Sequence, residues 1–378
     1  MTFLGACLAA ALVAQSGSSL RIDSVSALAR QPQADDPAVI WFDDFDGPEK
    51  PYTEAEGGLD DRVAFGGVGR SIACRYGKGE RGSGNRKVFF GDSPTGRVVR
   101  RGETFDDVYW RVYVRHQPGW AGGGEDKLSR ITSITSPRWT QAMIGHVWTS
   151  GETLTLDPAS GVRDDRVVTT RYNDFPRLRW LGNSPTARFP FSVPAESGWW
   201  VRVEARVKVN TPGERDGLMQ LWIDGRLEAE RTGLDWRGRY DGHGLNALFL
   251  ESYWNEGSPV DQTRWLDLFA ISTRPIGPVV TPRRPVLLLG GPAPEAARDG
   301  WEVEVAGDDG VVVWRSKPVV GATRATVDAE SGTFTGPLAG ADRLAADTSH
   351  ALRVRPLGGE AADAGWSDWH QVFRTGDE

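Results

Sequence analysis

The sequence predicts an all-β protein, built as a sandwich, a jelly roll or a barrel. Apolar residues recur at every second position through much of the range from residue 40 to residue 276, which is the period of a half-buried strand. The chain has 46 glycines, most of them in the stretches between these segments, where turns are needed. No segment of convincing length shows the 3.6-residue period of a helix. Many short strands separated by turn signals are typical of sandwiches and barrels.

Two segments alternate most strictly, 108–115 (VYWRVYVR) and 200–209 (WVRVEARVKV). In each, the apolar residues share one face, which we expect to pack on a core, because successive side chains of a strand point to opposite sides. The other face carries aromatic and charged side chains. Further strands are expected at 218–223, 245–254 and 265–271, and Asp224-Gly225 after the first of these is a strong hairpin-turn signal.

The chain divides into five parts. Residues 1–16 have the apolar run and small-residue cleavage site of a signal peptide, so we expect a secreted, periplasmic or cell-surface protein. This run is too short to span a membrane. Residues 17–39 are polar and unpatterned, and are interpreted as a linker. The larger domain is expected at 40–276 and a smaller sandwich at 286–378. The Pro-rich residues 277–285 form a second linker, because proline cannot join a strand ladder.

Composition excludes several classes of function. The net charge is −7 and the pI about 5.5, which excludes non-specific nucleic-acid binding. The sequence has no paired-carboxylate E-x-D-x-x-E strand, no Gly-rich phosphate loop, no G-x-S-x-G elbow and no H-E-x-x-H helix. Cys74 would be alone once Cys7 leaves with the signal peptide, and its alternation with Ile72 and Tyr76 predicts a buried thiol. We expect a monomer.

The segment 200–226 carries a family resemblance. The strand 200–209 is followed by an Asn210-Thr211-Pro212-Gly213 turn and then by a Trp222-Ile223-Asp224-Gly225 hairpin. This pattern resembles the concanavalin A-like jelly-roll polysaccharide lyases of the alginate and glucuronan lyase kind. The resemblance covers about residues 40–276 and includes these further segments: 71–79, 109–115, 124–128 and 265–272.

The resemblance implies a jelly roll that cleaves a uronate-containing polysaccharide by β-elimination. Such a reaction removes the C5 proton beside a carboxylate, so the carboxylate must be neutralised and a base must lie close to the proton. The candidate catalytic residues are Tyr253, His146 and Lys127. The candidate substrate-binding residues are Arg111, Tyr113, Arg115, Arg202, Glu204, Arg206 and Asn255. We expect these side chains to line one trough.

The same residues have a structural interpretation. Charges that alternate along a strand also form solvated ion-pair ladders, and His146, with the parity of Ile144 and Trp148, also fits a core histidine. The chain departs from the lyase pattern at Ser129-Arg130, where Pro-Gly is usual, and at 250–255, where aromatic-Gly-Gly is common. A non-catalytic carbohydrate-binding or cell-surface protein on the same scaffold, and a purely structural extracellular protein, therefore stay open.

Two smaller expectations complete the analysis. The segments 352–355, 366–369 and 373–375 resemble a fibronectin type III module, although His350 stands where that family usually has a tyrosine. No cofactor is certain; structural calcium could bind Asp60-Asp61, Asp157 or Asp164-Asp165, but their spacing has no EF-hand regularity and favours exposed turn carboxylates.

Overall fold

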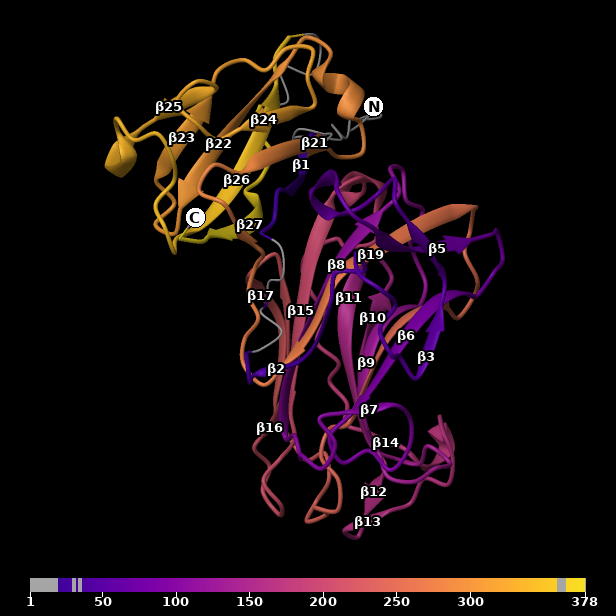
Figure 1. Ribbon diagram of the computed structural model, residues 1–378. Helices are drawn as coiled ribbons and strands as arrows, with labels where there is room; N and C mark the ends of the chain where they lie inside the picture. The colour runs from indigo at the N-terminus through magenta and orange to yellow at the C-terminus, as the bar shows by residue number, and fades with distance from the viewer. Residues whose placement is uncertain (1–19, 29–31, 33–35, 359–364, 378) are drawn as a thin grey trace, which may run out of the picture.

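The computed structural model describes residues 20–28, 32, 36–358 and 365–377. The predicted signal peptide at 1–16 lies outside these residues. The described chain forms two β-sandwiches, a larger one of magenta and purple strands and a smaller one that ends the chain in yellow (Figure 1). Its helical structure consists of five short 3-10 turns: η1 (Phe65–Gly67), η2 (Phe175–Arg177), η3 (Pro194–Glu196), η4 (Pro294–Ala297) and η5 (Gly336–Leu338). The prediction of an all-β jelly-roll sandwich followed by a smaller sandwich is confirmed.

The larger sandwich is a jelly roll of two eight-stranded sheets. We call the first the β15 sheet, in the order β17-β16-β15-β8-β19-β5-β4, with β2 paired to β19. Its strands are β17 (Arg226–Leu234), β16 (Gly217–Ile223), β15 (Trp200–Lys208), β8 (Asp107–His116), β19 (Gln262–Ser272), β5 (Ser71–Tyr76), β4 (Gly58–Asp60) and β2 (Val39–Asp43).

We call the second the β9 sheet, in the order β14-β11-β10-β9-β18-β6-β3, with β7 paired to β6. Its strands are β14 (Arg179–Trp180), β11 (Thr153–Ser160), β10 (Gln141–Ser150), β9 (Asp126–Ile134), β18 (Ala247–Trp254), β6 (Gly82–Phe90), β3 (Glu54–Glu56) and β7 (Val98–Val99). A small hairpin of β12 (Val162–Arg163) and β13 (Arg166–Val167) extends from the end of the jelly roll.

The two sheets enclose one apolar core, as the alternation predicts. The branched residues of β15 and the apolar face of β8 belong to it: Val201, Val203, Ala205, Val207, Val108, Trp110, Val112 and Val114. Cys74 also lies in this core with 1% of its surface exposed, so the prediction of a buried thiol is confirmed. The far faces of both sheets are therefore the places where polar function can reside.

The C-terminal sandwich takes one of its strands from the start of the chain. Its six-stranded sheet has the order β20 (Val280–Thr281), β27 (His370–Thr375), β26 (Ser349–Pro356), β22 (Trp301–Gly307), β23 (Val312–Ser316) and β25 (Gly332–Phe334). The opposing sheet has the order β1 (Arg21–Val25), β21 (Val286–Gly290) and β24 (Arg324–Thr326). The structure thus differs from both predicted linkers, because part of 17–39 and part of 277–285 are strands. The resemblance to fibronectin type III stays a prediction.

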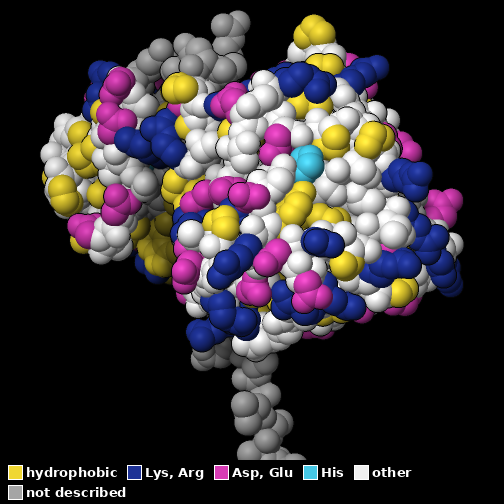
Figure 2. Space-filling model, turned by 90° about the horizontal axis from the view of Figure 1, so that it is seen from below, with side chains coloured by type: hydrophobic (Ala, Val, Ile, Leu, Met, Phe, Trp, Pro, Cys, Tyr) yellow, Lys and Arg dark blue, Asp and Glu magenta, His cyan; other side chains and the backbone are white. Residues whose placement is uncertain are grey.

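The two sandwiches share an apolar cluster. Trp200 and Tyr113 of the β15 sheet pack in it with Ile22, Leu287 and Val303 of the C-terminal sandwich. Their side chains are 1% exposed or less, which fixes the C-terminal sandwich on the outer face of the β15 sheet. The far end of the jelly roll shows basic and acidic side chains intermixed (Figure 2), and among the described residues no helix is long and apolar enough to cross a membrane.

Candidate active-site groove

The structure separates the predicted site residues into two sets on opposite faces of the jelly roll. Arg111, Tyr113, Arg115, Arg202, Glu204 and Arg206 lie on the outer face of the β15 sheet. Lys127, Tyr253 and Asn255 lie at the outer face of the β9 sheet. The expectation of one shared trough is therefore wrong, because β8 and β15 belong to a different sheet from β9 and β18.

On the β15 sheet, the polar face holds the segment that connects the two sandwiches. Glu204 accepts hydrogen bonds from the backbone N–H groups of Ile276 and Gly277, at 2.8 and 3.0 Å. Arg111 donates to the carbonyl oxygen of Gly277 at 3.0 Å, and the Tyr113 hydroxyl accepts from the N–H of Val279 at 3.0 Å. These side chains satisfy backbone groups that would otherwise be buried without partners.

The remaining side chains of this face are paired or buried. Arg115 donates to Asp23 of β1 at 2.6 Å. Arg202 is buried, with 4% of its surface exposed, and its Nε and Nη1 atoms have no hydrogen-bond partner among the described residues. Arg206, nearer the uncovered end of the strand, forms an ion pair with Asp107 at 2.6 Å. None of these six therefore faces an open groove. Trp200 and Glu204 of β15 contact the chain's own C-terminal part.

The outer face of the β9 sheet carries an open groove of about 460 Å³. It is lined by β3, β6, β9 and β18 together with the loop before and at η2. The lining side chains include Glu56, Asn85, Lys87, Lys127, Arg130, Tyr172, Asn173, Phe175, Glu251, Tyr253 and Asn255. Three of the predicted residues thus come together, and the groove adds others that the sequence analysis did not select.

Lys127 and Tyr253 lie side by side in the groove. The Lys127 ammonium lies 4.6 Å from the centre of the Tyr253 ring, and Tyr253 is 38% exposed. Burial, followed by Arg130, lowers the pKa of Lys127, whereas Glu251 and Glu125 raise it. Among the described residues Lys127 has no carboxylate within ion-pairing distance, so its charge is available to a ligand.

A bulge in β9 accounts for the meeting of Lys127 and Arg130. Residues three apart in a regular strand point to opposite faces, but the pairing of β9 with β10 shifts between Ser129 and Lys127. An extra residue in a ladder re-aims the side chains beside it, so Leu128 packs in the core while both cations reach the groove.

Arg130 and Glu251 form a buried ion pair in the groove floor, with 1% and 10% of their side chains exposed. Arg130 also donates to the Asn173 side-chain oxygen at 2.5 Å and lies 4.9 Å from the Tyr172 ring centre. Sequence reasoning missed this pair as site residues, although both lie in the segments where the chain departs from the lyase pattern. Those departures from the pattern were the signal from which Arg130 and Glu251 could have been selected.

His146 lies on β10 directly beside Arg130, but its ring is buried, at 1% exposure. Neither ring nitrogen has a hydrogen-bond partner among the described residues. Burial, followed by Arg130 and Lys127, lowers the pKa of His146 well below its ordinary value, so the imidazole is neutral. It stacks on Trp148 with ring centres 5.4 Å apart and supports the groove rather than lining it.

The predicted calcium candidates do not come together. In the part of the chain that the structure describes, no group of three or more His, Cys, Asp or Glu residues is arranged to hold a metal ion. The Asp60 carboxylate instead accepts hydrogen bonds from Arg62, Arg75 and Trp265. Asp157 lies beside His146 on β11, and burial raises its pKa to about 6.

Comparison with known proteins shows likenesses to solved structures at low sequence identity. No family model and no curated protein matches this chain. Among solved structures, it is similar to the alginate lyase vAL-1 from a Chlorella virus, at 13% identity over 58% of this chain and 90% of that one, with a TM-score of 0.42. It is similar to the PL-14 alginate lyase of the marine Aplysia kurodai, at 15% identity over 62% and 99%, with a TM-score of 0.45. The endo-β-1,4-glucuronan lyase of the fungus Trichoderma reesei is 14% identical over 62% and 96%, with a TM-score of 0.44.

Proposed function

We propose that this protein is an exported polysaccharide lyase that cleaves a uronate-containing polysaccharide by β-elimination in the groove of the β9 sheet. The observation that carries the proposal is the pairing of Lys127, a cation without a carboxylate partner among the described residues, with the half-exposed phenol of Tyr253. Elsewhere in the groove the charges are already matched, Arg130 by Glu251 and Lys87 by Glu54. An acidic sugar therefore finds one unmatched positive charge, directly beside a group that can transfer a proton.

The reaction divides between these two residues. Lys127 pairs with the uronate carboxylate and stabilises the negative charge that spreads onto it when the C5 proton leaves. In the proposed step Tyr253 is the base, and its deprotonated oxygen takes that proton. The electron pair of the C5–H bond forms the C4–C5 double bond and the C4–O4 bond breaks. The departing O4 oxygen then takes the proton from the Tyr253 phenol, so the phenolate is restored.

Asn255 and the Arg130–Glu251 pair position these groups. Asn255 donates to Glu125 at 2.5 Å and occupies the end of β18 where Tyr253 emerges. Arg130 lies behind Lys127 and contributes to the low pKa of its ammonium. The buried, neutral His146 completes the floor. In this proposal His146 is a positioning residue, because its nitrogens are covered from the groove.

The test is incubation of the full chain with alginate, glucuronan and heparinoids while the ultraviolet absorbance of unsaturated uronates is followed. We expect turnover of at least one polyuronate, and a loss of at least a hundredfold in Tyr253→Phe with unchanged thermal unfolding. An inactive wild-type protein across this panel would refute the lyase assignment.

A second function is favoured by one feature of the groove. The buried cation Arg130 is paired with Glu251 and donates to Asn173, so the groove holds a single unmatched charge, enough for binding with no turnover. The alternative is a carbohydrate-binding protein on the same scaffold. Retention of polyuronates without new absorbance would support it, and absence of both binding and turnover would leave a structural role.

A further inference from the structure

A second and larger cavity lies between the two sandwiches, on the side of the molecule away from the groove. It measures about 1040 Å³. One wall comes from the jelly roll, through the β16–β17 turn, the start of β17 and residues 188–199. The other wall comes from β26 and β27 of the C-terminal sandwich and from Asp368-Trp369. Ligand sites occur preferentially at such domain boundaries; we call this cavity the interdomain cleft.

The walls of the interdomain cleft are tied together, so the cavity is formed before any ligand arrives. Arg21 forms an ion pair with Glu196 at 2.8 Å, which links β1 to the jelly roll. His370 accepts from the N–H of Ile22 at 2.7 Å, and its other ring nitrogen lies 2.9 Å from the carbonyl of Asp368. Burial lowers the pKa of His370 to about 3, which keeps the ring neutral for these two bonds. A preformed site avoids much of the ordering cost of binding.

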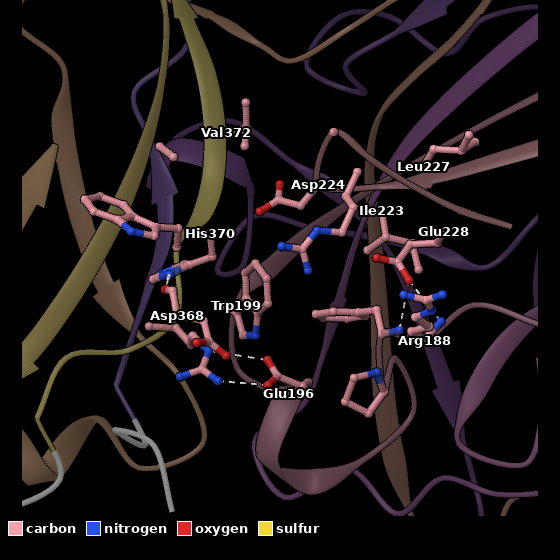
Figure 3. A pocket seen from close by; sticks show the side chains of 17 residues that line it. Arg188, Glu196, Trp199, Ile223, Asp224, Leu227, Glu228, Asp368, His370 and Val372 are labelled. Carbon is pink, nitrogen blue, oxygen red and sulfur yellow. Dashed lines mark hydrogen bonds and ion pairs between the residues drawn. The ribbon is translucent and has the colours of Figure 1, made fainter. Parts of the chain in front are cut away.

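The side chains that face the interdomain cleft combine flat aromatic surface with polar groups. Figure 3 shows His370 and Asp368 on one side, Glu228 and Arg188 on the other, and Trp199 between them. Trp369 is 40% exposed and lines the cleft. The indole N–H of Trp199, a residue 1% exposed, has no hydrogen-bond partner among the described residues. A buried donor without a partner calls for an explanation, and at a cavity wall an acceptor on a ligand would supply one.

The charge of the interdomain cleft differs in sign from that of the groove. The cleft is lined by three arginines (Arg21, Arg188, Arg226) and four carboxylates (Glu196, Asp224, Glu228, Asp368). The groove is lined by three cations (Lys87, Lys127, Arg130) and two carboxylates (Glu56, Glu251). A polyanion is therefore disfavoured in the cleft. Sugar rings present an apolar C–H face and a rim of hydroxyl groups, which matches indole surface beside paired polar groups.

We propose that the interdomain cleft is a second carbohydrate-binding site, and that it takes a neutral oligosaccharide. The sugar ring stacks on Trp369, and a ring hydroxyl accepts the N–H of Trp199. Arg188, Arg226, Glu228 and Asp368 then bind the remaining hydroxyls. The site is independent of the proposed lyase reaction, because no residue of the cleft belongs to the groove.

The test is calorimetric titration of the full chain with cellohexaose and mannohexaose as neutral probes and with a guluronate hexasaccharide as the acidic probe. We expect one of the neutral hexasaccharides to bind and to lose at least tenfold in affinity in Trp369→Ala. Leu227 is 47% exposed at the mouth of the cleft, so Leu227→Trp gives a second variant that blocks it. Trp180→Ala is the matched control, because Trp180 is a similarly exposed tryptophan, at 42%, outside the cleft.

The outcomes separate this site from the groove. Unchanged neutral binding in Trp180→Ala and Lys127→Met, with unchanged polyuronate turnover in Trp369→Ala, supports the proposal. Failure of both neutral probes to bind overturns it. Equal binding by wild type, Trp369→Ala and Leu227→Trp also overturns it, as does binding of the acidic probe that Trp369→Ala abolishes. An inactive groove with intact neutral binding would refute only the lyase assignment.

Discussion

The two outer faces of the jelly roll carry similar residues, but one face is covered by the rest of the chain and the other has an open groove. The β15 sheet presents Arg111, Tyr113 and Glu204, and the β9 sheet presents Arg130, Tyr253 and Glu251. On the β15 sheet these side chains bind the backbone of residues 276–279 and are covered. On the β9 sheet Tyr253 stays exposed in a groove. Polar alternation thus identifies a polar face, and the path of the rest of the chain decides whether that face is open.

The largest expected effect comes from removing what covers the β15 sheet. Deletion of residues 20–25 removes β1 and the preceding Leu20, and the side chains of Leu20, Ile22 and Val25 are all 0% exposed. Each contributes about 1.5–3 kcal/mol of burial, and Arg115 loses Asp23. We expect the C-terminal sandwich to unfold in a separate, earlier transition by calorimetry. Ile22→Ala is the milder variant, with a loss of about 2–5 kcal/mol. A single unshifted transition in the deletion variant would contradict this role for β1.

Next in size is the effect of removing the unmatched charge of the groove. Lys127→Met should lower polyuronate turnover by about 10²- to 10⁴-fold and leave the midpoint of thermal unfolding within a few degrees. Arg206→Met is the matched control on the β15 sheet, since Arg206 is bound to Asp107, and it should leave turnover unchanged. Equal turnover in the two variants would mean that the groove is not the reactive face.

A third prediction compares a buried glutamate of each jelly-roll sheet, Glu204 and Glu251. Glu204→Ala removes two charge-assisted hydrogen bonds to the backbone and leaves Arg111 buried with less compensation. We expect a loss of about 3 kcal/mol in the free energy of unfolding, with turnover unchanged. Glu251→Ala should also destabilise the fold, because it leaves Arg130 unpaired, but it should alter turnover and its pH profile as well. Denaturant unfolding and initial rates distinguish these cases.

The sequence allowed the fold to be predicted far better than the site. Strict alternation in 108–115 and 200–209 gave the core faces correctly, because strand parity is a local property. The site depends on features that the local alternation does not encode. Lys127 and Arg130 share a face only through a bulge in β9, and Arg111 is buried only because residues 276–279 return across it. The pairing of β1 with β21 joins segments more than 260 residues apart, which no local pattern encodes.

The last effect appears only when pH changes, and it concerns the boundary between the sandwiches. Asp224, in the β16–β17 turn, has its pKa raised to about 6 by burial, against the opposing effect of Arg202. A raised carboxyl pKa means that the folded state holds a proton that the unfolded state has lost between about pH 4 and pH 6. Folding is therefore most favoured below this window and loses about 3 kcal/mol as pH rises through it.

Asp224→Asn removes this dependence while it keeps the shape of the side chain. Asparagine also tolerates the positive φ of 48° at this position. We expect the free energy of unfolding of the variant to exceed that of the wild type by about 3 kcal/mol at pH 7.5 and to match it at pH 4. A constant difference between the two proteins across this range would show that Asp224 is already ionised in the folded state. The boundary between the sandwiches would then admit more water than its packing indicates. It would therefore differ less from the open groove.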